Sequence, residues 1–196
     1  MKKIILALLL FGSYLPSTAQ SNSDKNEIIS VSYFGHYGFH PGLKVGAQYS
    51  LKDWKKTKER KEKTKIKNKI LFISPQVGFY VHPGNHSGLL LNADLGYQRK
   101  KEHSSFYSAW TIGLGYLTQF NAGITYVQEQ NGSITAKKWA SRMYFFPTLN
   151  YEIGQQLNEK IGWFGKISAG AKLFYNTGIS PETFVEVGLK MNLSKF

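Results

Sequence analysis

The chain has 196 residues, a formal net charge of +13 at pH 7 and no cysteine. Without cysteine, a disulfide framework and a cysteine-linked lipid anchor are both excluded. Aromatic residues make up 15% of the chain, which also contains 19 glycines. Apolar and polar residues alternate in many segments, so we predict an all-β protein with one domain and no transmembrane helix.

Residues 1–19 are predicted to be a secretory signal peptide. Lys2 and Lys3 give it a positive start, the apolar run 4–11 is too short to span a bilayer, and small residues precede a cleavage site after Ala19. For a basic exported protein we expect outer-membrane lipid and lipopolysaccharide phosphates as partners, and no nucleic acid. A polar segment, 20–26, follows the predicted cleavage site, and we assign 27–196 to a barrel domain.

Eight segments with a period of two follow the polar N-terminal stretch, and each is expected to be a strand. They cover residues 27–35, 43–51, 70–81, 88–98, 106–117, 143–153, 161–175 and 184–196. The stretch 121–130 also alternates. We interpret it as one arm of a long loop, because bacterial barrels have even strand numbers.

The distribution of charge distinguishes this pattern from a soluble β-sandwich, which would also alternate. Charged residues lie deep in the strands on the polar face: Lys44, Asp94, Glu152, Lys166, Lys172, Glu186 and Lys190. The apolar face carries aromatic residues near the strand ends, as at Tyr33, Phe79 and Tyr151. We therefore predict an eight-stranded antiparallel up-and-down transmembrane β-barrel, integral to the bacterial outer membrane, with its apolar face toward lipid.

The seven charged residues on the polar face predict a filled lumen. They comprise four lysines and three acids, and buried charges persist only when they are paired. We expect an ion-pair and hydrogen-bond network rather than a water channel, since eight strands leave room only for side chains. An even strand number also places both chain ends on the periplasmic side.

The C-terminal sequence resembles the signal by which the outer-membrane assembly machinery recognises its clients. The residues that fit this pattern are Gly188, Met191, Leu193 and the terminal Phe196. We expect this segment to be the last strand, paired with the first so that no edge is left open in hydrocarbon.

A run of basic residues between the second and third predicted strands is interpreted as a long periplasmic loop. Its cations include Lys55, Lys56, Lys58, Arg60, Lys61, Lys63, Lys65 and Lys67. It could be a docking arm for an acidic partner or for inner-leaflet phosphates, or a solvated and mobile loop. If the first strand were assigned wrongly, the loop would face outward and clamp lipopolysaccharide.

Four histidines fall in two predicted outward turns, and we consider two roles for them. His36, His40, His82 and His86 could meet at one rim as a Zn or Cu site, although loop histidines are usually polar surface. We therefore predict neither a metal nor another cofactor. A hydrolase acting on lipid A could use His86 with Ser87, with Ser180 or Glu182 nearby. We expect no catalytic residue, because adjacent residues on a strand face opposite sides.

Two stretches carry a family resemblance: YFGHYGFHPGLKVGAQYSL at 33–51 and NHSGLLLNADLGYQRK at 85–100. The chain resembles an uncharacterised family of small outer-membrane β-barrels of the OmpA/OmpX type from Bacteroidetes-type bacteria. This resemblance implies a fold and a location, and no activity for any named residue.

The sequence therefore predicts a non-enzymatic outer-membrane barrel, acting as a structural protein or as an accessory subunit of a larger cell-envelope complex. The alternatives are an outer-leaflet hydrolase that modifies lipid A and a small channel.

Overall fold

The computed structural model describes residues 27–60, 63–129, 131–175 and 178–195. The predicted signal peptide, Lys61 and Phe196 lie outside these described residues. Within the described ranges, no helix is both long enough and apolar enough to cross a membrane.

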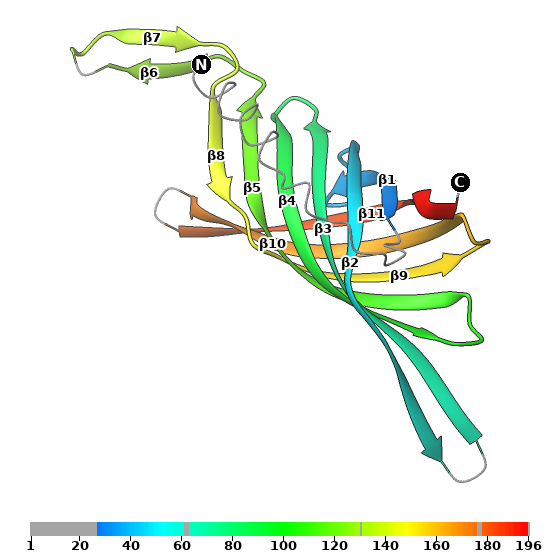
Figure 1. Ribbon diagram of the computed structural model, residues 1–196. Coiled ribbons are helices and arrows are strands. Elements are labelled where there is room, and N and C mark those ends of the chain that lie inside the picture. The colour runs from blue at the N-terminus through cyan, green and yellow to red at the C-terminus, as the bar shows by residue number, and fades with distance from the viewer. Residues whose placement is uncertain (1–26, 61–62, 130, 176–177, 196) are drawn as a thin grey trace, which may run out of the picture.

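Eleven strands make up most of the described chain (Figure 1). Their bounds are β1 (Glu27–His36), β2 (Gly42–Arg60), β3 (Lys63–His82), β4 (His86–Lys101), β5 (Phe106–Asn121), β6 (Thr125–Gln128), β7 (Ile134–Lys137), β8 (Ser141–Phe145), β9 (Thr148–Gln156), β10 (Ile161–Tyr175) and β11 (Gly178–Asn192). A short 3-10 helix, η1 (Leu193–Lys195), follows the last strand.

The strands form a closed antiparallel ring. Strands β1 to β5 pair in sequence order, and β11 pairs with β1 through contacts such as Val31 with Leu189. Strands β8 and β9 share one place in the ring, because both lie between β5 and β10. They are separated at Phe146 and Pro147, where proline has no N–H to donate. The prediction of an eight-stranded up-and-down barrel is confirmed.

The barrel is apolar outside and polar inside. Leu95, Ile112 and Ile167 expose 52%, 64% and 63% of their surface, while Asp94 and Glu186 are almost completely buried. This is the reverse of a soluble protein, in which apolar side chains are the buried ones. The outer face therefore has the character required for contact with acyl chains.

The barrel has two different ends, which we call the turn end and the terminal end. The turns after β1 and β3 lie at the turn end, as does the hairpin formed by β6 and β7, which we call the rim hairpin. The stretch 121–130 was predicted as one arm of a loop, and β6 is indeed one arm of this hairpin outside the ring.

The basic run is not a loop, which corrects the prediction. Strands β2 and β3 stay paired from Lys52 with Leu71 to Arg60 with Lys63, and they project from the terminal end (Figure 1). We call the described residues 52–60 and 63–69 the basic hairpin. A bulge at Leu51 shifts the register between Ser50 and Lys52. The extra residue changes which β2 side chains face outward beyond Leu51, while β2 and β3 remain paired.

Candidate functional site

The lumen holds a chain of buried charges contributed by β2, β4, β10 and β11. Lys44 Nζ lies 2.7 Å from Glu186 Oε2, and Lys166 Nζ lies 3.3 Å from the same oxygen. Lys166 also lies 3.7 Å from Asp94 Oδ2. Ser32 donates a hydrogen bond to Glu186 at 2.7 Å. Each buried carboxylate therefore has cations and donors that offset the loss of water.

Asp94 is surrounded by neutral donors as well as by Lys166. Side chains from four strands donate to its carboxylate: Gln76 at 3.0 Å, Asn92 at 2.5 Å, Thr111 at 3.3 Å and Asn150 at 3.3 Å. These bonds join β3, β4, β5 and β9 across the lumen. The network fixes the mutual positions of half of the ring.

Two further ion pairs lie on either side of this centre. Toward the terminal end, Lys190 Nζ is 2.5 Å from Glu152 Oε1 and 3.1 Å from the oxygen of Gln48. Toward the turn end, Lys172 Nζ is 2.5 Å from Glu182 Oε1.

The structure brings all seven predicted lumen charges into one interior. It adds Glu182, which the sequence analysis mentioned only beside His86 in the hydrolase alternative. In the described barrel, four lysines thus meet four carboxylates. The fourth acid was missed because β11 begins at Gly178, earlier than the predicted strand.

An aromatic layer separates the central charges from the turn end. Phe34, Tyr80, Leu90, Leu117, Phe146 and Phe184 form one buried cluster. The rings of Phe34 and Phe184 stack at 4.6 Å. The Tyr80 ring fits because residue 88 is glycine, where an added Cβ would lie 2.2 Å from that ring. These side chains fill the cross-section of the barrel.

Little space remains in the middle of the lumen. The cavity among Asp94, Glu152, Lys166 and Glu186 has a volume of about 10 Å³. A water molecule needs a cavity of roughly 10–15 Å³, so this cavity has room for about one water. Larger cavities of about 250 Å³ and 1040 Å³ open at the terminal and turn ends.

Four histidines gather at the turn end, where β1, β3 and β4 meet. One ring nitrogen from each of His36, His40 and His82 lies within 4.8 Å of the other two. The centroid of the His86 ring is 5.1 Å from that of His82. Burial, and then the nearby Glu182 carboxylate, raise the pKa of Tyr37 in the adjacent turn.

His36 is not a turn residue, which corrects its predicted place. It ends β1 with its side chain inside the barrel, and Glu182 accepts a hydrogen bond from its Nε2. The sequences of the two predicted turns, 36–42 and 82–88, contain no acid. Glu182 reaches the cluster from β11, which is distant in sequence and adjacent to β1 in the ring.

His86 and Ser87 lie on opposite sides of β4. His86 Nε2 accepts a hydrogen bond from the Gln119 amide at 3.0 Å and lies 3.1 Å from the Tyr80 hydroxyl. Ser87 follows on the opposite side of the pleat, level with Val81 and Phe120.

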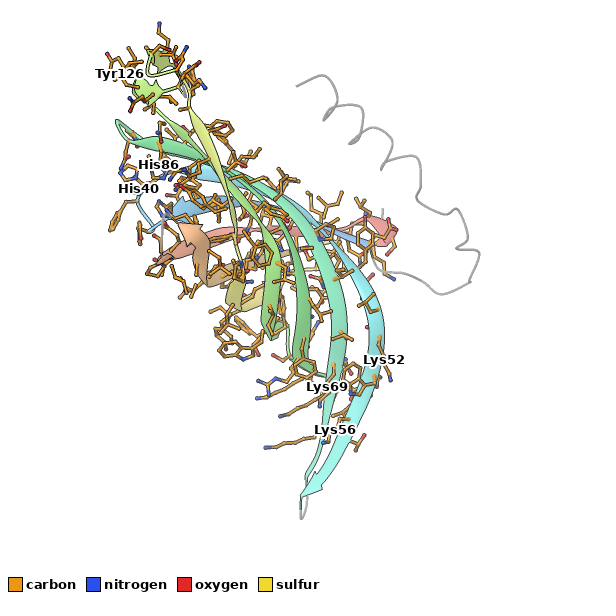
Figure 2. All side chains as sticks on the ribbon, turned by 90° about the vertical axis from the view of Figure 1, so that its left-hand side faces the viewer. His40, Lys52, Lys56, Lys69, His86 and Tyr126 are labelled. Atoms are coloured by element: carbon orange, nitrogen blue, oxygen red, sulfur yellow. The ribbon has the colours of Figure 1, made fainter. Side chains whose placement is uncertain are left out.

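The basic hairpin presents cations on the outward face. Register places Trp54, Lys69 and Arg99 in one row across β2, β3 and β4. Lys56, Lys67 and Lys101 form the next row, farther from the barrel. Figure 2 shows Lys52, Lys56 and Lys69 at the end of the barrel opposite His40 and His86. The register shift at Leu51 brings these cations into rows. The alternation of the sequence alone does not reveal the bulge, so the rows could not be predicted from it.

Aromatic side chains lie directly above these cationic rows. Leu71, Tyr97, Trp110 and Tyr151 form one row around the outer wall. Lys69 Nζ lies 5.5 Å from the centroid of the Tyr97 ring and 5.9 Å from that of Trp54. An aromatic belt followed by cations is typical of a membrane–water interface.

The predicted assembly signal lies at the terminal end. Gly188 and Met191 belong to β11, and Leu193 begins η1. At Gly188 an added Cβ would lie 2.4 Å from the β1 carbonyl oxygen of Val31. Glycine is therefore needed where the last strand pairs with the first.

Neither a protein-family model nor a curated protein sequence matches the chain. Solved structures that are similar to it include the following three. Neisserial surface protein A has a TM-score of 0.57 and 9% identity, covering 87% of this chain and 97% of its own. The N-terminal β-barrel domain of Pseudomonas aeruginosa OprF has a TM-score of 0.55 and 11% identity, and the match covers 86% of this chain and 98% of that domain. The outer membrane enzyme PagL has a TM-score of 0.51 and 8% identity, and the match covers 85% of this chain and 99% of PagL.

These similarities concern the fold, because the sequence identities are low. The chain therefore has the eight-stranded barrel fold of small outer-membrane proteins of the OmpA/OmpX type.

Proposed function

We propose that this chain is a non-enzymatic integral protein of the bacterial outer membrane, acting as a structural or accessory subunit of a larger cell-envelope complex. The observation that carries the proposal is the closed lumen, filled by paired charges and an aromatic layer. With the interior occupied, the surfaces available to partners are the two ends and the lipid-facing wall.

Three features support the outer-membrane location. The outer wall is apolar, the similar solved structures include outer-membrane proteins, and the N-terminal sequence predicts export. Membership of the Bacteroidetes-type family remains a prediction from the sequence resemblance.

The rows nearest the barrel suit lipid phosphates. Lys56, Lys67, Lys69, Arg99 and Lys101 lie just beyond the aromatic row, where headgroups would lie if the apolar wall spans the hydrocarbon. Each cation near an anionic surface contributes about 1 kcal/mol of attraction. By strand parity, this leaflet is the periplasmic one.

The outer part of the basic hairpin suits an acidic protein partner. The nine residues of β2 beyond Leu51 extend about 30 Å at roughly 3.3 Å per residue. Cα register sets Lys58 opposite Lys65 and Arg60 opposite Lys63. The sequence from Lys55 to Lys67 carries eight cations and two acids, and an acidic surface would offset this excess of positive charge. We therefore assign this part as the docking arm.

Purification in mild detergent tests the complex. A tagged chain expressed in its native host should retain a partner in constant ratio through size-exclusion chromatography. Lys58→Glu with Lys65→Glu should release the partner, while Lys137→Glu with Lys138→Glu in the rim hairpin should retain it. A chain that elutes alone under every mild condition contradicts the subunit role, and equal loss in both double variants contradicts the docking arm.

The alternative of an outer-leaflet hydrolase is supported by the fold that the chain shares with one enzyme, the outer membrane enzyme PagL. Mass analysis of lipid A from cells with and without the gene distinguishes the two proposals. We expect the same lipid A in both. A change that His86→Ala reverses would support the enzyme and contradict the non-enzymatic role.

The channel alternative predicts conductance steps in planar bilayers. We expect none, because the central cavity has a volume of only about 10 Å³. Reproducible steps from the folded protein would overturn the filled-lumen account.

A further inference from the structure

The histidine cluster at the turn end is built from three separate segments. His36 ends β1, His40 lies in the turn that follows, and His82 ends β3. The turn is fixed to β3, because Val81 N–H donates to the Pro41 carbonyl at 2.9 Å. The rings of His40 and His82 have centroids 3.6 Å apart, and that of His36 lies 5.6 Å from His40. The barrel pairing thus brings three imidazoles together.

Hydrogen bonds to two of these rings determine which nitrogens remain free to bind. Glu182 holds the Nε2–H of His36, so Nδ1 carries the lone pair of that ring. The His36 carbonyl lies 3.1 Å from Nδ1 of His40 and accepts its proton, so Nε2 carries the lone pair there. Metal-binding histidines typically donate their other N–H to a carboxylate or a backbone carbonyl.

Two of the nitrogens are buried and have no partner among the described residues. They are Nδ1 of His36 and Nδ1 of His82. His36 exposes only 2% of its surface. Buried polar atoms are nearly always bonded, and an orphaned one calls for an explanation such as an ion. An ion at this place would satisfy both nitrogens.

We propose that His36, His40 and His82 bind one divalent transition-metal ion, with Zn²⁺ as the best fit. Neutral imidazole suits zinc, and three histidines leave a fourth position for water. Ligand nitrogens of a tetrahedral zinc ion are about 3.3 Å apart, so the nitrogens must close from their present separation. His40 can supply this movement by rotation of its side chain, while the backbone of its five-residue turn stays bonded to β3.

Glu182 is a positioning residue in this site. It orients His36 by the hydrogen bond and is itself held by Lys172 at 2.5 Å. His86 lies beside the cluster and is not a ligand, because its Nε2 already accepts the Gln119 amide. The proposal is independent of the complex-subunit role.

Calorimetric titration tests the site. The chain is purified in detergent without a polyhistidine tag, treated with a chelator, and titrated with ZnCl₂. We expect one ion per chain, and at least tenfold weaker binding for His40→Ala and for His82→Ala. His103→Ala is the matched control, because His103 is exposed beyond β4 at the terminal end. Its binding should equal that of the unchanged chain.

Cobalt supplies a readout of the ligands themselves. Co²⁺ in place of Zn²⁺ should give the absorption bands of a four-coordinate nitrogen site, and His40→Ala should abolish them. Glu182→Gln should weaken zinc binding about 10- to 100-fold, the usual effect of losing such a partner. Folding of each variant is checked by its heat-dependent mobility on gels.

Three results would overturn the proposal. They are the absence of zinc binding by the folded chain, binding unchanged in both His40→Ala and His82→Ala, and equal weakening by His103→Ala.

Discussion

Lys44 and Glu186 form an ion pair of 2.7 Å that crosses over β1, joining β2 to β11 inside the barrel. Strand β1 contributes Ser32, which donates to the same carboxylate. The ion pair and the Ser32 hydrogen bond together hold β2 and β1 to β11 at the seam where the ring closes.

Removing this carboxylate charge should destabilise the barrel strongly. In Glu186→Gln, Lys44 loses its only carboxylate contact in the described network, and Lys166 keeps only the longer contact to Asp94. Breaking a buried pair typically costs about 3–5 kcal/mol. Urea unfolding in lipid vesicles measures the loss. Glu27→Gln, at an exposed site, is the control. A loss below 1 kcal/mol would contradict a buried pair.

Filling the space under an aromatic ring should also destabilise the fold. At Gly96 an added Cβ would lie 2.2 Å from the Phe72 ring. Gly96→Ala should cost about 1–3 kcal/mol, as overpacking usually does. Gly123→Ala is the control, because no atom lies within 4 Å of the added Cβ. Equal stability of the two variants would mean that Phe72 does not occupy the lumen as described.

Charge at the middle of the outer wall tests its contact with lipid. Ile112 and Ile134 expose 64% and 70% of their surfaces, on the barrel wall and on the rim hairpin respectively. Ile112→Arg should lower the free energy of unfolding by about 2–4 kcal/mol, which is the cost of placing arginine at the bilayer midplane. Ile134→Arg should lose almost nothing because it stays in water. Both are followed by unfolding in vesicles, and equal effects would count against a lipid-facing wall.

The cationic rows predict a preference for anionic lipid. Native mass spectrometry of the protein released from mixed nanodiscs should show retained phosphatidylglycerol. Lys56→Glu with Lys67→Glu should reduce the number retained, because these residues face each other in one row. Lys137→Glu with Lys138→Glu at the other end is the control for net charge. If both double variants retain as many phosphatidylglycerol molecules as the unchanged chain, the assignment of the cationic rows to lipid headgroups is wrong.

The strand number, the two faces of the barrel and the lumen charges could be predicted from sequence. Alternation fixes which residues share a face, as for Asp94 and Lys166, because each strand has a period of two. The same alternation places Phe34, Phe72 and Phe184 on the polar face. The packing of Phe34 and Phe184 into the aromatic layer, and of the Phe72 ring against Gly96, was not predicted, because it depends on register and on facing glycines such as Gly88 and Gly96.

The basic hairpin and the histidine–carboxylate contact could not be predicted from local sequence. Lysine is depleted in strands, and the bulge at Leu51 interrupts the alternation, so the paired region resembled a loop. His36 and Glu182 are brought together only by the pairing of β1 with β11. Contacts of this kind require the closed ring and its register.

The central claim is that acyl chains, rather than water or protein, cover the apolar wall. Analytical ultracentrifugation of the folded protein after removal of all detergent tests it most directly. The account predicts aggregation in plain buffer and a single species when detergent is restored. A folded, monodisperse protein in buffer without any amphiphile would contradict it.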